Sequence, residues 1–133
     1  MMVFQNALQK YLIENITEAN DVTPNVISRE VNDKYLVYQK VDFAAPIGLN
    51  DILNVEEATF QIDAYAYRKE DAQKIINQVK NKLLGFQGIM HGFIVQGIEI
   101  TDWEDDYEDG TELYREMIDF DIYYKYEGVK VNE

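Results

Sequence analysis

The stretch EATFQIDAYAYRKEDAQKIINQVKNKLLG, residues 57–85, is the most informative part of the chain, because its apolar spacing changes from two residues to between three and four. Its first part alternates apolar residues such as Phe60 and Ile62 with polar ones, which predicts a β-strand over Glu57–Tyr67. Its second part predicts an amphipathic helix over Glu70–Leu84, with acidic residues in the first turn and Gly85 after the last. The apolar stripe of this helix consists of Ala72, Ile75, Ile76, Val79 and Leu83.

The same patterns predict three more strands and one more helix. β-Branched and aromatic residues are dense over Lys34–Phe43, and two further strands are expected over Phe93–Trp103 and Leu113–Tyr126. Apolar residues at helical spacing predict a short helix over Val3–Leu12. The polar stretch Asn15–Asp33 has no sustained period and is interpreted as a connection.

These elements predict an α+β fold: a single antiparallel β-sheet of about four strands, packed against two amphipathic helices on one face. A length of 133 residues predicts one domain. We expect an N-terminal helix and connection at residues 1–33, a sheet-helix core at 34–126 and a short C-terminal tail at 127–133.

Composition excludes several classes of function. Lys and Arg number 12 against 25 Asp and Glu, and the resulting charge of −13 disfavours general binding to a phosphate backbone. The absence of cysteine excludes disulfides, thiolate metal sites and cysteine nucleophiles. Neither a signal-peptide pattern nor an apolar run of membrane-spanning length is present, so we expect a soluble protein made in the cytoplasm.

Catalytic motifs are missing as well. The sequence contains no Gly-rich phosphate loop and no Ser with a plausible His partner, and no metal-ligand spacing surrounds His91. His91 precedes Gly92 and is interpreted as a turn residue. Asp119 and Asp121 share one face of a predicted strand, where exposed charge that discourages edge pairing is a better explanation than acid/base catalysis. We therefore expect no enzymatic activity and no cofactor.

The segment Asp102–Glu112 is strongly acidic, and we interpret Glu104–Gly110 as a turn between two strands. Four residues match positions 1, 5, 6 and 12 of an EF-hand calcium loop, namely Asp105, Asp109, Gly110 and Glu116. Tyr107 stands at position 3, where a carboxylate is required, and the flanking residues have strand rather than helix period. A solvated hairpin tip is the favoured interpretation, and a metal-binding domain built on this segment is an alternative.

Two segments are candidate interaction surfaces. The loop 44–56 places apolar residues among the breakers Pro46, Gly48 and Asn50, which is typical of a loop with something apolar to contact. The acidic turn is the second segment. The candidate interaction residues are Ile47, Leu49, Ile52, Leu53, Asp102, Glu104, Asp105, Asp106, Glu108 and Asp109.

Three segments in order resemble a known family: YLVYQKV at 35–41, FQIDAYAYRKEDAQKI at 60–75 and YREMIDFDIYYK at 114–125. The chain resembles the tail-completion proteins, also called tail terminator or tail-to-head joining proteins, of long-tailed bacteriophages and prophages. The resemblance spans roughly residues 34–126. The matching positions are Val37, Tyr38, Gln39, Gln61, Ile62, Asp63, Tyr65, Ala66, Ala72, Asp119, Phe120, Ile122 and Tyr123.

This resemblance implies a non-enzymatic virion protein at the interface of head and tail, synthesised in the bacterial host cytoplasm. Such a protein forms a ring, usually hexameric, on the head-proximal end of the tail tube and stops tube polymerisation. Its implied partners are further copies of itself, the tail tube protein and a head-completion or connector protein, with no membrane. DNA passes through the ring without being specifically bound, and the isolated chain is either a ring or a monomer.

An acidic inhibitor that mimics DNA is another alternative. Such a protein spreads carboxylates over its surface at phosphate-like intervals, whereas Arg68–Lys82 holds five basic residues against two acidic ones. The charge is therefore lopsided, which disfavours mimicry.

Overall fold

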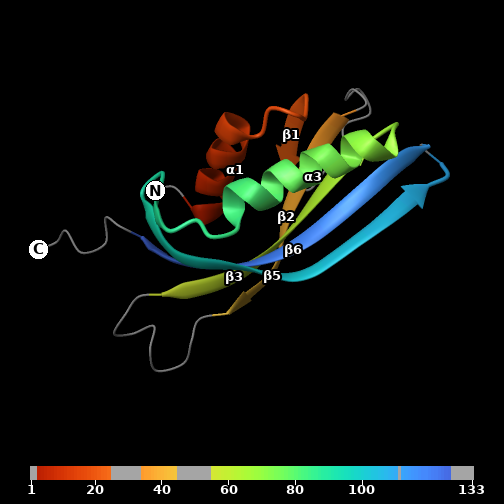
Figure 1. The fold of residues 1–133 in the computed structure, drawn as a ribbon. Coiled ribbons are helices and arrows are strands. Elements are labelled where there is room, and N and C mark those ends of the chain that lie inside the picture. Colours follow the sequence, from red (N-terminus) through yellow and green to blue (C-terminus); the bar gives the residue numbers. More distant parts are fainter. Residues whose placement is uncertain (1–2, 25–33, 45–54, 111, 127–133) are drawn as a thin grey trace, which may run out of the picture.

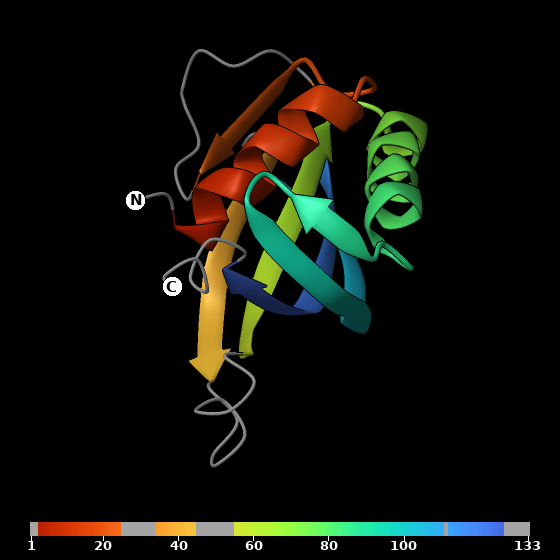
Figure 2. The same cartoon turned by 90° about the vertical axis from the view of Figure 1, so that its left-hand side faces the viewer.

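The structure is a computed structural model, and it describes residues 3–24, 34–44, 55–110 and 112–126 of the chain. The helices are α1 (Phe4–Asn15) and α3 (Lys69–Leu83). The strands are β1 (Asp21–Pro24), β2 (Lys34–Ala44), β3 (Glu56–Ala66), β4 (Gly88–Met90), β5 (Phe93–Glu108) and β6 (Leu113–Tyr126). Both helices lie on the same face of one curved sheet, and the other face carries no helix from the described part of the chain (Figures 1 and 2).

The expectation of about four antiparallel strands is wrong. In the described residues the sheet has six strands in the order β1-β2-β3-β6-β5-β4, and β1 pairs with β2 in parallel, so the sheet is mixed. The two unexpected strands are the outermost ones, with four and three residues. Elements this short show no hydrophobic period and are held by backbone pairing to their neighbours. The fold is still α+β.

Helix α3 follows the sequence pattern closely. Its buried residues are Ala72, Ile75, Ile76, Val79 and Leu83, the same stripe that the spacing predicts. Gly85 has a φ of 84°, the left-handed conformation that glycine adopts at little cost after a helix. Leu84 N–H donates to the Lys80 carbonyl at 2.8 Å, which closes the last turn.

The main core lies between the helices and the face of the sheet that they cover, which we call the helix face. Phe4 of α1 is 3% exposed and stacks on Tyr124, with ring centroids 4.0 Å apart and planes 11° apart. Phe60 and Phe120 pair across β3 and β6 at the centre of the same face. Tyr11 Oη donates to the Lys82 carbonyl at 2.7 Å, so the two helices also contact each other.

The single histidine, His91, lies in the turn between β4 and β5. His91 and Gly92 have φ values of 45° and 93°, and a two-residue turn with both φ values positive matches the twist of the flanking strands. His91 Nε2 lies 2.9 Å from Oε1 of Glu14, so the turn is also tied to α1. These contacts give His91 a structural role.

A second, smaller cluster lies on the opposite side of the sheet, which we call the open face. Tyr35 and Tyr65 stack there with centroids 4.9 Å apart, close to Asp63, which is 3% exposed. Arg115 donates to Asp63 Oδ2 from Nη2 at 2.7 Å and from Nε at 3.2 Å. Burial raises the pKa of Asp63, and Arg115 opposes that shift. Asp63 Oδ1 has no hydrogen-bond partner among the described residues.

We expect Leu8→Ala to destabilise the protein far more than Ile13→Ala on the same helix. Leu8 is fully buried and Ile13 is 57% exposed. Loss of a buried leucine costs about 2–5 kcal/mol, whereas an exposed substitution costs less than about 0.5 kcal/mol. Urea unfolding of both variants checks this difference, and equal losses would show that α1 does not pack on the sheet.

Arg115→Met leaves the buried Asp63 carboxylate without its cation, so we expect a loss of about 3–5 kcal/mol. The double variant Asp63→Asn/Arg115→Met removes both charges and recovers part of that loss. Chemical denaturation of both variants measures the coupling. A double variant no more stable than Arg115→Met would contradict this account.

Candidate functional site

Most of the predicted acidic turn is part of a strand. Strand β5 continues to Glu108, which pairs with Leu113, and the hairpin loop is confined to Asp109–Glu112. The prediction that the strand ends at Trp103 is therefore wrong. Backbone pairing with the long strand β6 holds the acidic residues in extended conformation whatever their charge.

Because neighbouring side chains on a strand point to opposite faces, this extension separates the acidic residues into two sets. Cross-strand partners share a face, so Asp102 lies with Asp119 and Glu104 with Met117 on the open face. Asp105 lies with Glu116 on the helix face. The candidate carboxylates on β5 thus belong to two different surfaces.

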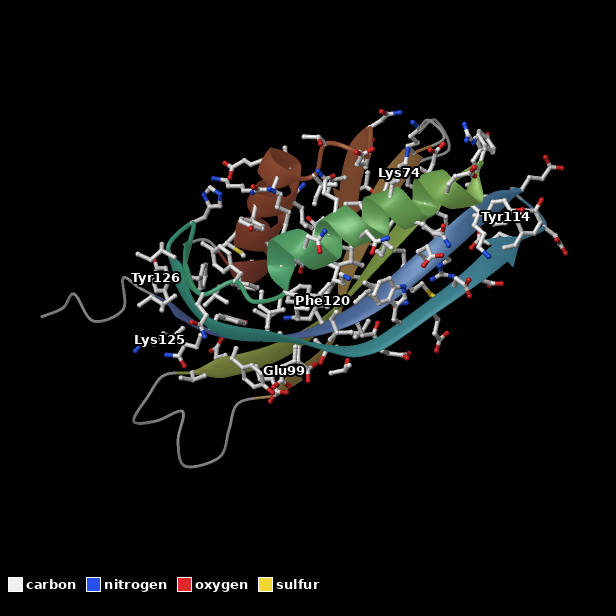
Figure 3. All side chains as sticks on the ribbon, in the orientation of Figure 1. Lys74, Glu99, Tyr114, Phe120, Lys125 and Tyr126 are labelled. Carbon is white, nitrogen blue, oxygen red and sulfur yellow. The ribbon has the colours of Figure 1, made fainter. Side chains whose placement is uncertain are left out.

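The open face carries a concentration of negative charge across three strands. Glu99 points away from the helices there (Figure 3). In the described residues the basic side chains on this face are Arg115 and Lys125. Its acidic residues are Glu57 and Asp63 on β3, Glu99, Asp102, Glu104, Asp106 and Glu108 on β5, and Asp119 and Asp121 on β6.

These carboxylates are close enough to perturb one another. A hydrogen bond with Asp102, followed by the charge of that residue, raises the pKa of Glu104. Burial raises the pKa of Asp119, and the charges of Asp102 and Asp121 add to the shift. Thr59 Oγ1 donates a short hydrogen bond of 2.5 Å to Asp121 Oδ1. The face is therefore strongly negative at neutral pH, and on it Glu104 and Asp119 take up protons more readily than isolated carboxylates.

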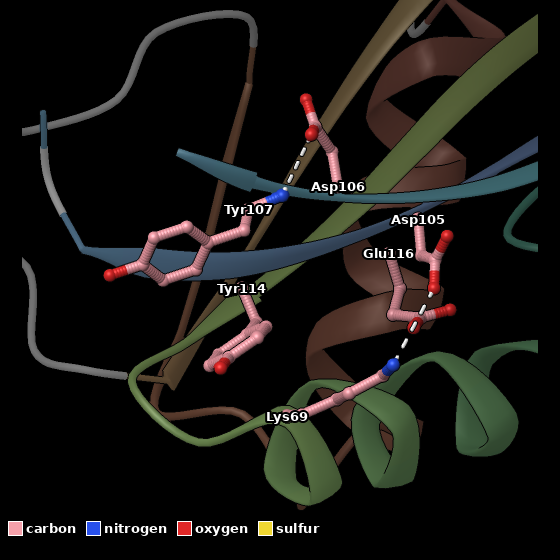
Figure 4. Close-up of a pocket in the computed structure, with 6 residues that line it drawn as sticks. All are labelled: Lys69, Asp105, Asp106, Tyr107, Tyr114 and Glu116. Carbon is pink, nitrogen blue, oxygen red and sulfur yellow. Dashed lines mark hydrogen bonds and ion pairs between the residues drawn. The ribbon is translucent and has the colours of Figure 1, made fainter. Parts of the chain in front are cut away.

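The end of the β5–β6 hairpin forms a small cavity of about 190 Å³ against the start of α3. Its lining residues are Lys69, Asp105, Asp106, Tyr107, Tyr114 and Glu116 (Figure 4). Lys69 Nζ lies 3.9 Å from Asp105 Oδ2, and both side chains are more than half exposed. The rings of Tyr107 and Tyr114 are in contact, with centroids 4.8 Å apart.

Glu116 forms the inner wall of this cavity and is 6% exposed. Trp103 Nε1 donates to Glu116 Oε1 at 3.1 Å, and Lys80 of α3 lies over the Trp103 ring at 5.6 Å. These contacts link the end of the hairpin to the helix layer. The cavity is thus supported from both layers of the fold.

The outer side of α3 has a different character. A shallow groove of about 460 Å³ follows it, lined by lysine, asparagine and glutamine side chains together with Glu18. Gln78 Oε1 accepts hydrogen bonds from the backbone N–H groups of Thr17 and Glu18, each at 2.9 Å. The groove is rich in hydrogen-bond donors, because ammonium and amide groups dominate its lining. The lining residues are Glu18, Lys74, Asn77, Gln78, Asn81 and Lys82.

The structure brings together only some of the residues chosen from sequence. Ile47, Leu49, Ile52 and Leu53 lie outside the described residues. Asp105 and Asp106 both line the hairpin-end cavity, but their side chains point to opposite faces of β5. Asp102 and Glu104 lie along the open face, and Asp109 lies in the turn. The candidate interaction residues chosen from sequence did not include Lys69, Tyr107, Tyr114 or Glu116, and Glu116 was considered only as position 12 of the EF-hand match. If the sequence analysis had extended the strand through residues 103–108, the alternation of side chains would have placed Asp105 and Tyr107 on the same face.

The structure also bears on the calcium alternative. The segment that matches EF-hand spacing is flanked by β5 and β6, not by helices. Across the described ranges, no group of three or more His, Asp or Glu side chains is positioned to hold a metal ion. Neither described helix is long and apolar enough to cross a bilayer.

Comparison with known proteins gives one family and one fold. A family model described as tail completion protein gp17 matches residues 15–125. A solved chain from the virion of a native gene transfer agent particle shares the fold, with a TM-score of 0.69 and 15% sequence identity. That alignment covers 90% of this chain and 92% of the other. No curated protein matches in sequence.

We expect Asp119→Asn to stabilise the protein by about 0.5 kcal/mol at neutral pH, as for other partly exposed charges. The folded-state pKa of Asp119 is raised, so its ionised form is destabilising, and its contribution to stability falls as pH rises through that pKa. The gain from the variant therefore shrinks as pH falls toward about 4. Urea unfolding between neutral pH and about pH 4 measures how the stability gained from Asp119→Asn changes with pH. The variant Asp109→Asn, in the exposed turn, is the control. A gain that grows on acidification would contradict it.

Proposed function

The chain belongs to the family of tail completion proteins of the gp17 type, and from this premise we propose that it closes the head-proximal end of a long phage tail tube. As a member of this family it is a structural protein of the virion. In the proposed role it stops polymerisation of the tube protein and then offers a surface to the head connector. It acts by assembly and carries out no enzymatic step.

The proposed assembly is a ring, with six copies as the expected number. A ring requires contacts between unlike surfaces that close on themselves, since like-to-like contacts would end at a dimer. The tail tube protein contacts one rim of the ring and the head-completion protein contacts the other. Residues 1–133 act in this ring as one domain.

The observation that best supports the proposal is the charge of the open face. DNA that leaves the head must slide through the ring, and a wall of carboxylates repels the phosphate backbone and does not retain it. The open face presents such a wall, with Glu99, Asp102 and Glu104 along β5 and acidic neighbours on β6. We therefore assign the open face to the channel.

Assembly of the cognate tube protein with and without this chain tests the proposal. We expect tubes made without it to be overlong or unable to join heads, and tubes made with it to end in a ring at one end. Negative-stain microscopy measures both outcomes. If tube length and head joining do not depend on the chain, the family role does not apply to it, and the acidic face points to an inhibitor or a cation-binding protein.

Reversal of charge on the open face tests the channel assignment separately. We expect Glu99→Lys/Asp102→Lys/Glu104→Lys to slow DNA delivery far more than it reduces capping, because the wall would then attract phosphate. The neutral variant Glu99→Gln/Asp102→Asn/Glu104→Gln is the matched control and should give a smaller effect of the same sign. DNA release from particles that carry each variant provides the measurement. Unchanged release in both would remove the open face from the channel.

A further inference from the structure

We propose that neighbouring copies of this chain contact each other through two unlike surfaces, the hairpin-end patch of one copy and the helix-groove patch of the next. The hairpin-end patch consists of Asp105, Asp106, Tyr107 and Tyr114. The helix-groove patch consists of Lys74, Asn77, Asn81 and Lys82 on α3. This inference deepens the proposed function and rests on it, since it names the contact that builds the ring.

The hairpin-end patch has the chemistry of an acceptor surface for basic side chains. Asp105 is 58% exposed at its side chain, Tyr107 is 43% exposed overall, and Glu116 adds a third carboxylate behind them. Exposed tyrosine beside a concave site is typical of residues that dominate binding energy at protein interfaces. The rings also offer faces to a cation. The patch therefore fits an ammonium group flanked by hydrogen-bond donors.

Lys69, the basic residue that already lies at the hairpin-end patch, does not block the patch for a partner. Lys69 lies 3.9 Å from Asp105, at the limit of an ion pair, and its side chain is 55% exposed. An exposed pair of this kind contributes little and is readily rearranged. Asp106 Oδ1 accepts the backbone N–H of its own neighbour, Tyr107, at 2.8 Å. The carboxylates of the patch are thus accessible to a partner without loss of a strong internal bond.

The helix-groove patch has the opposite chemistry. Lys74, Asn77 and Asn81 follow one another at helical spacing, and each is exposed. Helix α3 holds the acids Glu70 and Asp71 and the lysines Lys69, Lys74, Lys80 and Lys82, so four positive and two negative charges give it a net charge of +2. A basic helix is unusual in a chain of net charge −13, and it indicates a surface that meets acidic groups.

The positions of the two patches favour repeated, unlike contacts. Lys74 points outward from the helix layer, whereas Tyr114 lies at the end of the hairpin (Figure 3). Two hairpin-end patches would repel each other, and so would two helix-groove patches. Each copy can therefore use both patches at once, one toward each neighbour, which generates a ring when the rotation closes. Apart from Asp106 at its end, the open face takes part in neither contact and stays free for the channel.

Charge exchange between the patches provides the test. We expect Asp105→Lys/Asp106→Lys and Lys74→Glu/Lys82→Glu each to reduce self-association and tube capping at least tenfold. An equal mixture of the two variants restores both, because copies alternate around an even-numbered ring and every contact again joins opposite charges. All four substitutions in one chain restore them as well. Circular dichroism melting confirms that each variant is folded.

Asp21→Lys is the control, since it reverses an exposed charge on β1 outside both patches. We expect it to associate and cap as the unaltered chain does. Full activity of either patch variant alone, or failure of the folded variants to restore activity in the mixture, would overturn the inference.

Direct measurement of binding between the two patch variants separates this inference from the proposed function. Sedimentation velocity should detect association in the mixture and not in either variant alone, whether or not tubes are present. If the unaltered chain caps tubes but the mixture does not associate, the family role stands and the contact is wrong. If the mixture associates but the unaltered chain fails to cap tubes, the contact stands and the role is wrong.

Discussion

The fold depends on the burial of one face of the β3–β6 strand pair. Phe60 opposite Phe120 and Ile62 opposite Ile118 provide an apolar surface that must be covered, and α1 and α3 cover it. Because side chains alternate, the same pairing sends Gln61 and Asp119 to the other side. A single register thus creates the core and the charged open face together.

In the proposed function, this two-sided construction allows a chain of net charge −13 both to assemble and to transmit DNA. Negative charge is concentrated where water and nucleic acid are expected, and the exposed lysines of α3 lie on the opposite side. On the open face, the ion pair with Arg115 compensates the charge of the buried Asp63 carboxylate. Charge therefore separates the two surfaces that we assign to the channel and to subunit contact.

Sequence reasoning was most accurate where periodicity is long. Helix α3 and the strands β2, β3 and β6 lie within one or two residues of their expected bounds, because each is long enough to show a regular apolar period. The edge strands β1 and β4 were not predicted, since they are too short to show a hydrophobic period. Acidic composition was mistaken for a turn at Glu104–Glu108, where pairing with β6 overrides propensity. The hairpin-end cavity joins Lys69 to Asp105, which are far apart in the chain, so no local pattern could reveal it.

The most direct test of the central claim is an electron cryomicroscopy reconstruction of tubes capped by this chain. Our account predicts a ring at the head-proximal end in which the open face, with Glu99 and Asp102, borders the channel and the helices lie away from it. A ring in which the open face is buried between subunits, or lies on the outer surface, would contradict the account.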